Sequence, residues 1–136
     1  DMYRAISEVH RLLKPGGEAI VMLYHKWSFV GYMLWFRYAL MRFRPWLSLK
    51  CIYSEYVESK GTQAFNVEEA RDFFKEFETI DIHINLTHGD LLTSKAGQRH
   101  EGVILDIARR ILPRFLIRRL FKNHGLFMKI RAKKKG

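Results

Sequence analysis

The most constraining feature of the sequence is a short turn, Lys14-Pro15-Gly16-Gly17, between two segments with different apolar patterns. Before the turn, apolar residues recur at helical spacing and predict an amphipathic helix over residues 1–13. After it, Ala19–Tyr24 is apolar without alternation, as is typical of a strand buried on both faces of a parallel sheet. Because proline cannot continue a helix and glycine tolerates positive φ, the turn ends the helix sharply. These three parts indicate half of an α/β unit.

The next segment is rich in aromatic residues and predicts a helical cap. Residues 26–44 predict a helix that begins at a capping serine, Ser28, and ends at Pro45. Apolar side chains surround this helix almost completely. Residues 46–60 predict a short helix followed by a loop.

The remainder of the chain predicts a helix, a strand and a closing helix and strand. Asn66 and Glu69 have capping-box spacing and therefore predict the start of a helix. Strict alternation over Ile80–Leu86 predicts a strand with one apolar and one polar face, which is typical of an antiparallel or edge position. Further helices are expected over residues 102–112 and 113–121, and a last strand over residues 126–132.

Composition limits the class of protein. The chain has 136 residues and is 48% hydrophobic, which suits one domain with a real core and argues against disorder. Its single cysteine, Cys51, excludes a disulfide framework and a cysteine-based zinc site, and favours a reducing compartment. No signal peptide is visible, and the longest apolar run, Phe29–Phe36, is far shorter than the roughly 20 residues of a membrane-spanning helix. We expect a cytoplasmic location, with peripheral contact to the membrane as an open alternative.

Charge is distributed unevenly along the chain. The net charge is +10, and residues 109–136 contain eleven basic residues and no acidic one. A basic region of this kind suits an anionic partner, either a membrane surface or nucleic acid, or it forms a solvated tail. No RNA-binding or DNA-binding motif accompanies it, so we do not expect nucleic acid as the partner.

Two stretches resemble a known family. Residues 8–24, with Leu-Leu-Lys-Pro-Gly-Gly at their centre, resemble the late motif of class I S-adenosylmethionine-dependent methyltransferases, in which a helix leads into the fifth strand. Residues 58–70, with Gly61-Thr62-Gln63-Ala64-Phe65-Asn66, are similar to a segment of a bacterial branch of that family. Residues 125–134 resemble the seventh strand, which inserts antiparallel between the fifth and sixth.

The resemblance implies a fold and a domain organisation. The expected fold class is α/β: the C-terminal portion of a Rossmann-like methyltransferase sheet, with the fifth to seventh strands, the last two antiparallel, and helical cap insertions. The chain would form one partial methyltransferase domain over residues 1–136. Within it we expect a helix-turn-strand unit, a helical cap, and then a helix, the sixth strand, a helical insertion, the seventh strand and a basic tail, over residues 1–26, 27–60 and 61–136.

This sequence lacks the elements that form the donor site in the family. A glycine-rich loop after the first strand and a carboxylate ending the second hold S-adenosylmethionine in the family. The sequence has no such loop, and Gly16-Gly17 leads into a strand instead of out of one. Asp1 itself falls inside a helical pattern. We therefore expect the donor to be bound by a half that precedes Asp1, with no cofactor-binding residue in this chain and no activity of the chain alone.

Candidate site residues lie after the buried strand, because ligands of open α/β sheets sit beyond the carboxyl ends of the strands. His25 is a candidate general base, since its unperturbed pKa lies near neutrality; the alternative is a structural histidine bonded to a loop carbonyl. Tyr24 and Trp27 could line an acceptor pocket, and Glu55 and Tyr56 could reach the acceptor from the following loop. The alternatives are core packing and solvation. We expect no metal, because His83, His88, His100 and His124 lack metal-ligand spacing.

The sequence leaves two function classes open. In the first, the parent enzyme methylates a small or lipid-linked acceptor. In the second, the chain is a non-catalytic module for a membrane surface or nucleic acid, using the aromatic and arginine-rich residues 27–49 and the basic residues 109–135. An apolar cap packed on the domain is the alternative interpretation of residues 27–49.

Overall fold

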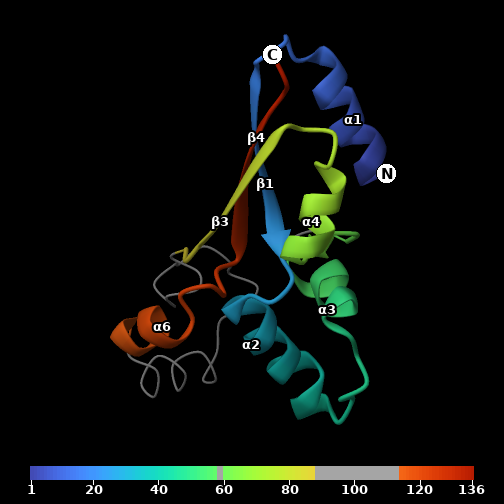
Figure 1. The fold of residues 1–136 in the computed structure, drawn as a ribbon. Helices are drawn as coiled ribbons and strands as arrows, with labels where there is room; N and C mark the ends of the chain where they lie inside the picture. Colours follow the sequence, from blue (N-terminus) through green and yellow to red (C-terminus); the bar gives the residue numbers. More distant parts are fainter. Residues whose placement is uncertain (58–59, 88–113) are drawn as a thin grey trace.

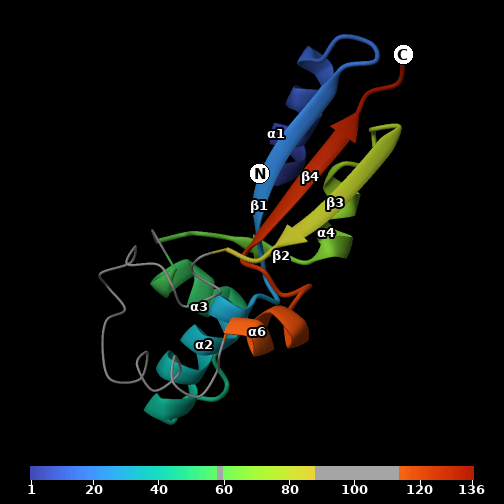
Figure 2. The same cartoon turned by 90° about the vertical axis from the view of Figure 1, so that its left-hand side faces the viewer.

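The structure of the chain is a computed structural model that describes residues 1–57, 60–87 and 114–136. A four-stranded mixed sheet has helices α1 and α4 on one face, and helices α2, α3 and α6 gather at one of its ends (Figures 1 and 2). The predicted α/β class is confirmed at this level, while the helix expected over residues 102–112 lies outside the described residues. The helices are α1 (Met2–Leu12), α2 (Phe29–Tyr38), the 3-10 helix η1 (Leu40–Arg42), α3 (Leu49–Tyr56), α4 (Val67–Phe73) and α6 (Arg114–Leu120), and the strands are β1 (Glu18–His25), β2 (Ala64–Phe65), β3 (Thr79–Asn85) and β4 (Phe127–Lys133).

The closing strand lies inside the sheet. The strand order is β2-β1-β4-β3, and β4 pairs antiparallel with both β1 and β3. Its pairing with β1 runs from Glu18 opposite Lys133 to Tyr24 opposite Phe127. β1 and β3 therefore point the same way, with the last strand of the chain between them. The predicted position of this strand is confirmed.

The prediction that β1 is buried on both faces is wrong. Ile20 and Met22 on β1 are 58% and 62% exposed, whereas Ala19 and Leu23 on the opposite face are buried. The described helices α1 and α4 cover only that opposite face. The parallel pairing that was predicted for β1 is also short, because β1 pairs in parallel only with the two-residue strand β2. Absence of alternation in the sequence thus did not mean burial on both faces.

Helix α1 packs on the sheet through a narrow stripe. Ile6 is buried, and Met2, Val9 and Leu13 pack beside it. Leu12 is exposed although it belongs to the apolar pattern over residues 1–13, because it lies to one side of the contact line. Asp1 is the N-cap of the helix instead of an internal residue, and its side chain accepts a hydrogen bond from the backbone N–H of Tyr3.

Helix α4 begins and packs as its sequence predicts. The Asn66 side chain accepts from the backbone N–H of Glu69, at 2.7 Å, and the Glu69 carboxylate accepts from the backbone N–H of Asn66, at 2.8 Å. This reciprocal capping box satisfies two N–H groups that the first turn leaves without helical partners. Ala70 and Phe74 are fully buried against the sheet, with Phe77 beside them.

Helix α2 is shorter than predicted. Ser28 caps its start as expected, but the helix ends at Tyr38 instead of continuing to Arg44. A turn of 3-10 helix follows, and Phe43 then adopts the left-handed conformation. The backbone N–H of Arg44 donates to the carbonyl of Ala39 and that of Phe43 donates to Leu40, which is the Schellman pattern of a helix end. The helix is thus closed before Pro45 is reached. The short helix predicted next is present as α3.

Part of the basic C-terminal region has a structural role. The Lys134 ammonium donates to the carbonyl oxygens of His10 and Leu13, at 2.8 and 2.9 Å, and so caps the carboxyl end of α1. Arg131 pairs with Glu18 across the β1–β4 ladder at 2.7 Å. These two cations have partners within the fold, and both lie on the strand or tail that ends at the far end of the sheet from α2 (Figure 1).

Candidate functional site

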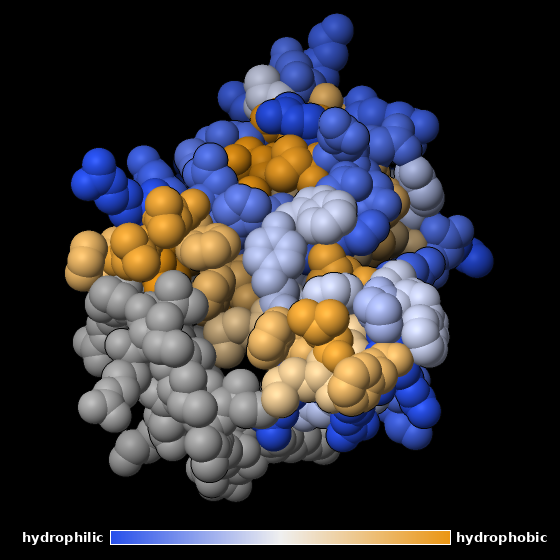
Figure 3. Space-filling model, turned by 90° about the horizontal axis from the view of Figure 1, so that it is seen from below, coloured by the Kyte–Doolittle hydropathy of each residue, from blue (hydrophilic) through white to orange (hydrophobic). Residues whose placement is uncertain are grey.

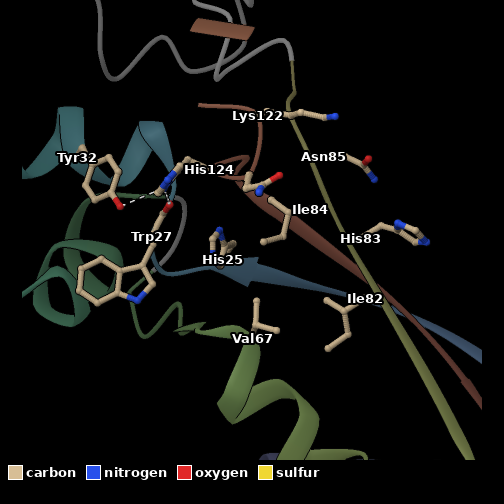
Figure 4. A pocket seen from close by; sticks show the side chains of 11 residues that line it. His25, Trp27, Tyr32, Val67, Ile82, His83, Ile84, Asn85, Lys122 and His124 are labelled. Atoms are coloured by element: carbon tan, nitrogen blue, oxygen red, sulfur yellow. Dashed lines mark hydrogen bonds between the residues drawn. The ribbon is translucent and has the colours of Figure 1, made fainter. Parts of the chain in front are cut away.

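A pocket of about 880 Å³ opens where β1 and β3 end (Figure 4). Both strands end there with their carboxyl termini, which is the usual position of ligand sites in open α/β sheets. Aromatic, imidazole, amide and ammonium groups occur together around it, over an apolar base. The lining residues are His25, Trp27, Tyr32, Val67, Ile82, His83, Ile84, Asn85, Lys122, Asn123 and His124.

His124 lies at the junction of three parts of the chain. Its Nδ1 is 2.8 Å from the carbonyl oxygen of Trp27 and 3.2 Å from the hydroxyl of Tyr32. The backbone N–H of Phe29 donates to the carbonyl of His124 at 2.7 Å. The turn before β4 is thereby joined to the start of α2, and Figure 4 shows the imidazole beside Tyr32 and Trp27.

The neighbours of His124 assign its tautomer. A carbonyl oxygen only accepts hydrogen bonds, so the proton of the neutral ring lies on Nδ1 and points at Trp27. The Nε2 atom then carries the lone pair and can accept a proton. Burial raises the pKa of the Tyr32 phenol above its ordinary value, because the charged phenolate loses solvation. The pocket therefore holds a base and a phenol next to each other.

His25 has the surroundings of a structural histidine. Its side chain is 4% exposed, and its Nδ1 lies 3.3 Å from the carbonyl oxygen of Gly125. Its backbone N–H donates to Leu126 at 2.8 Å. This geometry agrees with the alternative of a histidine bonded to a loop carbonyl. It favours His124 over His25 as the proton acceptor of the pocket, because a base has to be reached by its substrate.

A buried hydrogen-bond chain fixes the cap to the end of β1. The Tyr53 hydroxyl donates to the carbonyl of His25 at 2.8 Å. Since this uses its only proton, the Ser28 hydroxyl donates in the 2.5 Å contact with Tyr53. Ser28 in turn accepts from the backbone N–H of Gly31 at 2.9 Å. A β-carbon at Gly31 would lie 2.6 Å from the Tyr53 hydroxyl, so glycine permits this close packing of α3 on α2.

Tyr53→Phe is expected to lower the free energy of unfolding by about 1–3 kcal/mol, because it leaves the buried His25 carbonyl and the Ser28 hydroxyl without this partner. Urea denaturation followed by circular dichroism measures the change. Lys50→Ala, at an exposed position on the same helix, is the control, and it is expected to change stability by less than about 0.5 kcal/mol. Equal effects of the two substitutions would contradict the assigned hydrogen-bond chain.

The structure brings only some of the predicted site residues together. His25 and Trp27 line the pocket. Tyr24 points to the opposite face of the sheet from His25, where its ring packs at 5.1 Å from that of Phe127. Glu55 is exposed, and Tyr56 stacks on Tyr38 with ring centres 3.9 Å apart. Tyr24, Glu55 and Tyr56 are not among the lining residues, so the geometry gives them packing or solvent positions.

Sequence reasoning missed the contribution of residues 122–124. Lys122, Asn123 and His124 precede the last strand and are about one hundred positions from His25. In the sequence they lie between the helix expected over residues 113–121 and the strand expected over residues 126–132. They enter the pocket because β4 inserts beside β1, which brings the residues before it to the carboxyl end of β1. The one sequence signal that could have identified them is the resemblance of the last strand to an inserted strand, because such a strand brings the residues before it to the end of β1.

Comparisons with protein-family models, curated proteins and solved structures found no match to this chain. In the described ranges, no group of three or more His, Cys, Asp or Glu residues is arranged to hold a metal ion. No helix in the described part of the chain has the length and apolarity needed to cross a membrane.

Proposed function

We propose that the chain is the C-terminal part of a class I S-adenosylmethionine-dependent methyltransferase that acts on a small or lipid-linked acceptor. One observation carries the proposal: β4, the last strand of the chain, lies antiparallel between the parallel strands β1 and β3. The resemblance of residues 8–24, 58–70 and 125–134 to that family concerns the segments around these strands.

The residues that the structure describes offer no arrangement that suits the donor. The glycine pair Gly16-Gly17 precedes β1, at the opposite end of the strand from the pocket. β1 ends in His25 and β3 in Asn85, and neither strand is followed by a glycine-rich loop in the described residues. Within the proposal, the donor is therefore held by a segment that precedes Asp1, and no cofactor contact is assigned here.

The pocket supports a role on the acceptor side. Methyl transfer requires that the nucleophile be held in line with the donor, which is chiefly a matter of positioning. Trp27 and Tyr32 offer aromatic faces, and Lys122 and Asn85 offer donors for polar groups of an acceptor. For a hydroxyl acceptor, the Nε2 atom of His124 is the base that takes the proton. His25 would support this site through the Gly125 carbonyl instead of contacting the acceptor.

The test compares two proteins by calorimetric titration with S-adenosylmethionine. One is the chain described here, and the other includes the sequence encoded before Asp1. We expect the longer protein to bind the donor and the shorter one not to bind it. A preceding sequence without a glycine-rich loop after a strand, or a folded longer protein that fails to bind, would overturn the proposal.

A further inference from the structure

Exposed apolar side chains gather in the cap around the end of α2 and η1, a part of the fold that lies opposite the C-terminus (Figure 1). Figure 3 views the molecule from this end and shows apolar residues facing the viewer, bordered by hydrophilic ones. One group of exposed apolar residues belongs to the second half of α2, to η1 and to the loop before α3. We name this cluster the aromatic tip, and its members are Phe36, Leu40, Met41, Phe43 and Trp46.

Two aromatic residues of the tip project into solvent. Phe43 is 87% exposed and Trp46 is 77% exposed. Phe43 also has φ 54° and ψ 37°, the left-handed conformation at a helix end where glycine is favoured. A phenylalanine side chain at this position does not contribute to the core, and it does not lower the conformational strain of the left-handed backbone. Its presence therefore suggests a function outside the fold of the chain.

The segments that carry the tip are fixed by a hydrogen bond, a ring stack and a small buried cluster. The indole N–H of Trp35 donates to the carbonyl of Leu47 at 2.7 Å, which closes the loop that carries Phe43 and Trp46. The rings of Tyr38 and Tyr56 stack at 3.9 Å and join α2 to α3. Beneath them, Leu34, Ala39 and Ile52 form a small buried cluster. The exposed side chains are thus presented by packed helices.

The charged residues of the segment that carries the tip, residues 26–54, all have the same sign. Arg42, Arg44 and Lys50 are exposed, and Arg37 is partly exposed with its guanidinium over the ring of Tyr38. No acidic residue occurs between Lys26 and Ser54. Apolar and aromatic side chains surrounded by cations suit the surface of an anionic bilayer. The apolar side chains can enter the headgroup region, and the cations can contact the lipid phosphates.

We propose that the aromatic tip docks the protein onto an anionic phospholipid surface. Phe43 and Trp46 insert at the level of the headgroups, and the arginines contact the phosphates. This surface is distinct from the pocket, and the proposal does not depend on methyltransferase activity. The lysines at 133–135 take no part, because they lie at the other end of the molecule (Figure 1).

The first experiment is co-sedimentation of the full 136-residue chain with vesicles. Vesicles containing equal amounts of phosphatidylcholine and phosphatidylglycerol are expected to bind the chain, and vesicles of phosphatidylcholine alone to bind it much less. Binding should weaken as salt is raised, because the arginine contacts are screened. Equal binding to both kinds of vesicle would overturn the proposed role of the arginines.

Substitutions separate docking from folding. Phe43→Gly is expected to weaken vesicle binding about tenfold, since it removes the inserted ring. It should also raise the melting temperature, because glycine accepts the left-handed conformation. The double variant Arg42→Gln with Arg44→Gln is expected to weaken binding about tenfold or more. Leu12→Ala is the control: it removes an apolar side chain that is 71% exposed at the end of α1, away from the tip, and should bind as the parent does.

Tryptophan fluorescence tests the orientation. Emission of the chain should shift to shorter wavelength when anionic vesicles are added, and Trp46→Phe should abolish the shift although Trp27 and Trp35 remain. Unchanged binding in Phe43→Gly would overturn the proposal. A dimer in sedimentation velocity that Phe43→Gly dissolves, without vesicle binding, would also overturn it and assign the tip to self-association.

Discussion

Phe74→Ala is expected to lower the free energy of unfolding by about 3–5 kcal/mol, the range for removing a fully buried phenylalanine. Phe74 has no exposed surface and packs between the end of α4 and the sheet. Its ring lies 5.6 Å from that of Phe77. The substitution leaves a cavity between α4 and the sheet. The side chains around it, including Met128 and Ile130, belong to paired strands and cannot move far enough to fill it. Urea denaturation followed by circular dichroism measures the loss.

The control for this prediction is Phe43→Ala. It removes the same side chain from an 87% exposed position without changing the demand for positive φ. We expect it to change the free energy of unfolding by less than about 0.5 kcal/mol. Similar losses from the two substitutions would mean that Phe74 does not occupy the core position described here.

Gly125→Ala is expected to lower the free energy of unfolding by about 3 kcal/mol or more, because it forces two backbone segments apart. A β-carbon at Gly125 would overlap the carbonyl group of Asn85 and lie 2.8 Å from the backbone nitrogen of Leu86. Main-chain atoms at the end of β3 cannot rotate away as a side chain could. Denaturation measures the loss of stability, and amide chemical shifts of residues 84–86 report the local displacement.

Gly61→Ala is the control for this steric effect. Gly61 has φ +91° but open space around it, so alanine there meets conformational strain without a clash. We expect a cost of about 1–2 kcal/mol. If Gly125→Ala were no more harmful than Gly61→Ala, the close approach between the turn before β4 and the end of β3 would be refuted. That approach also forms one wall of the pocket.

Local signals predicted most of the elements correctly. The capping box at Asn66 and the alternation over Ile80–Leu86 are complete within a few neighbouring residues, so they are readable from the sequence. The end of α2 was not readable in this way. It depends on backbone hydrogen bonds to Ala39 and Leu40 and on a left-handed phenylalanine, which no propensity rule favours.

Prediction of the candidate site was less complete. His25 and Trp27 were found because residues after a buried strand lie near ligands in α/β sheets. Tyr24 was grouped with them, although alternate residues of a strand point to opposite faces. His124 was not grouped with them, since its place beside Trp27 and Tyr32 depends on pairing between strands that are far apart in the chain.

The sequence by itself determined the local elements: the sharp stop at Pro15-Gly16-Gly17, the start of α4 and the two-faced character of β3. Each follows from interactions among residues within a few positions of one another. Only the tertiary structure decided which face of β1 is covered, and that His124 lines the same pocket as His25 and Trp27. It also decided that Lys134 caps α1 while Phe43 and Trp46 remain exposed. The reason is that burial and proximity come from non-local packing, in which β4 joins the two ends of the chain through its hydrogen bonds to β1.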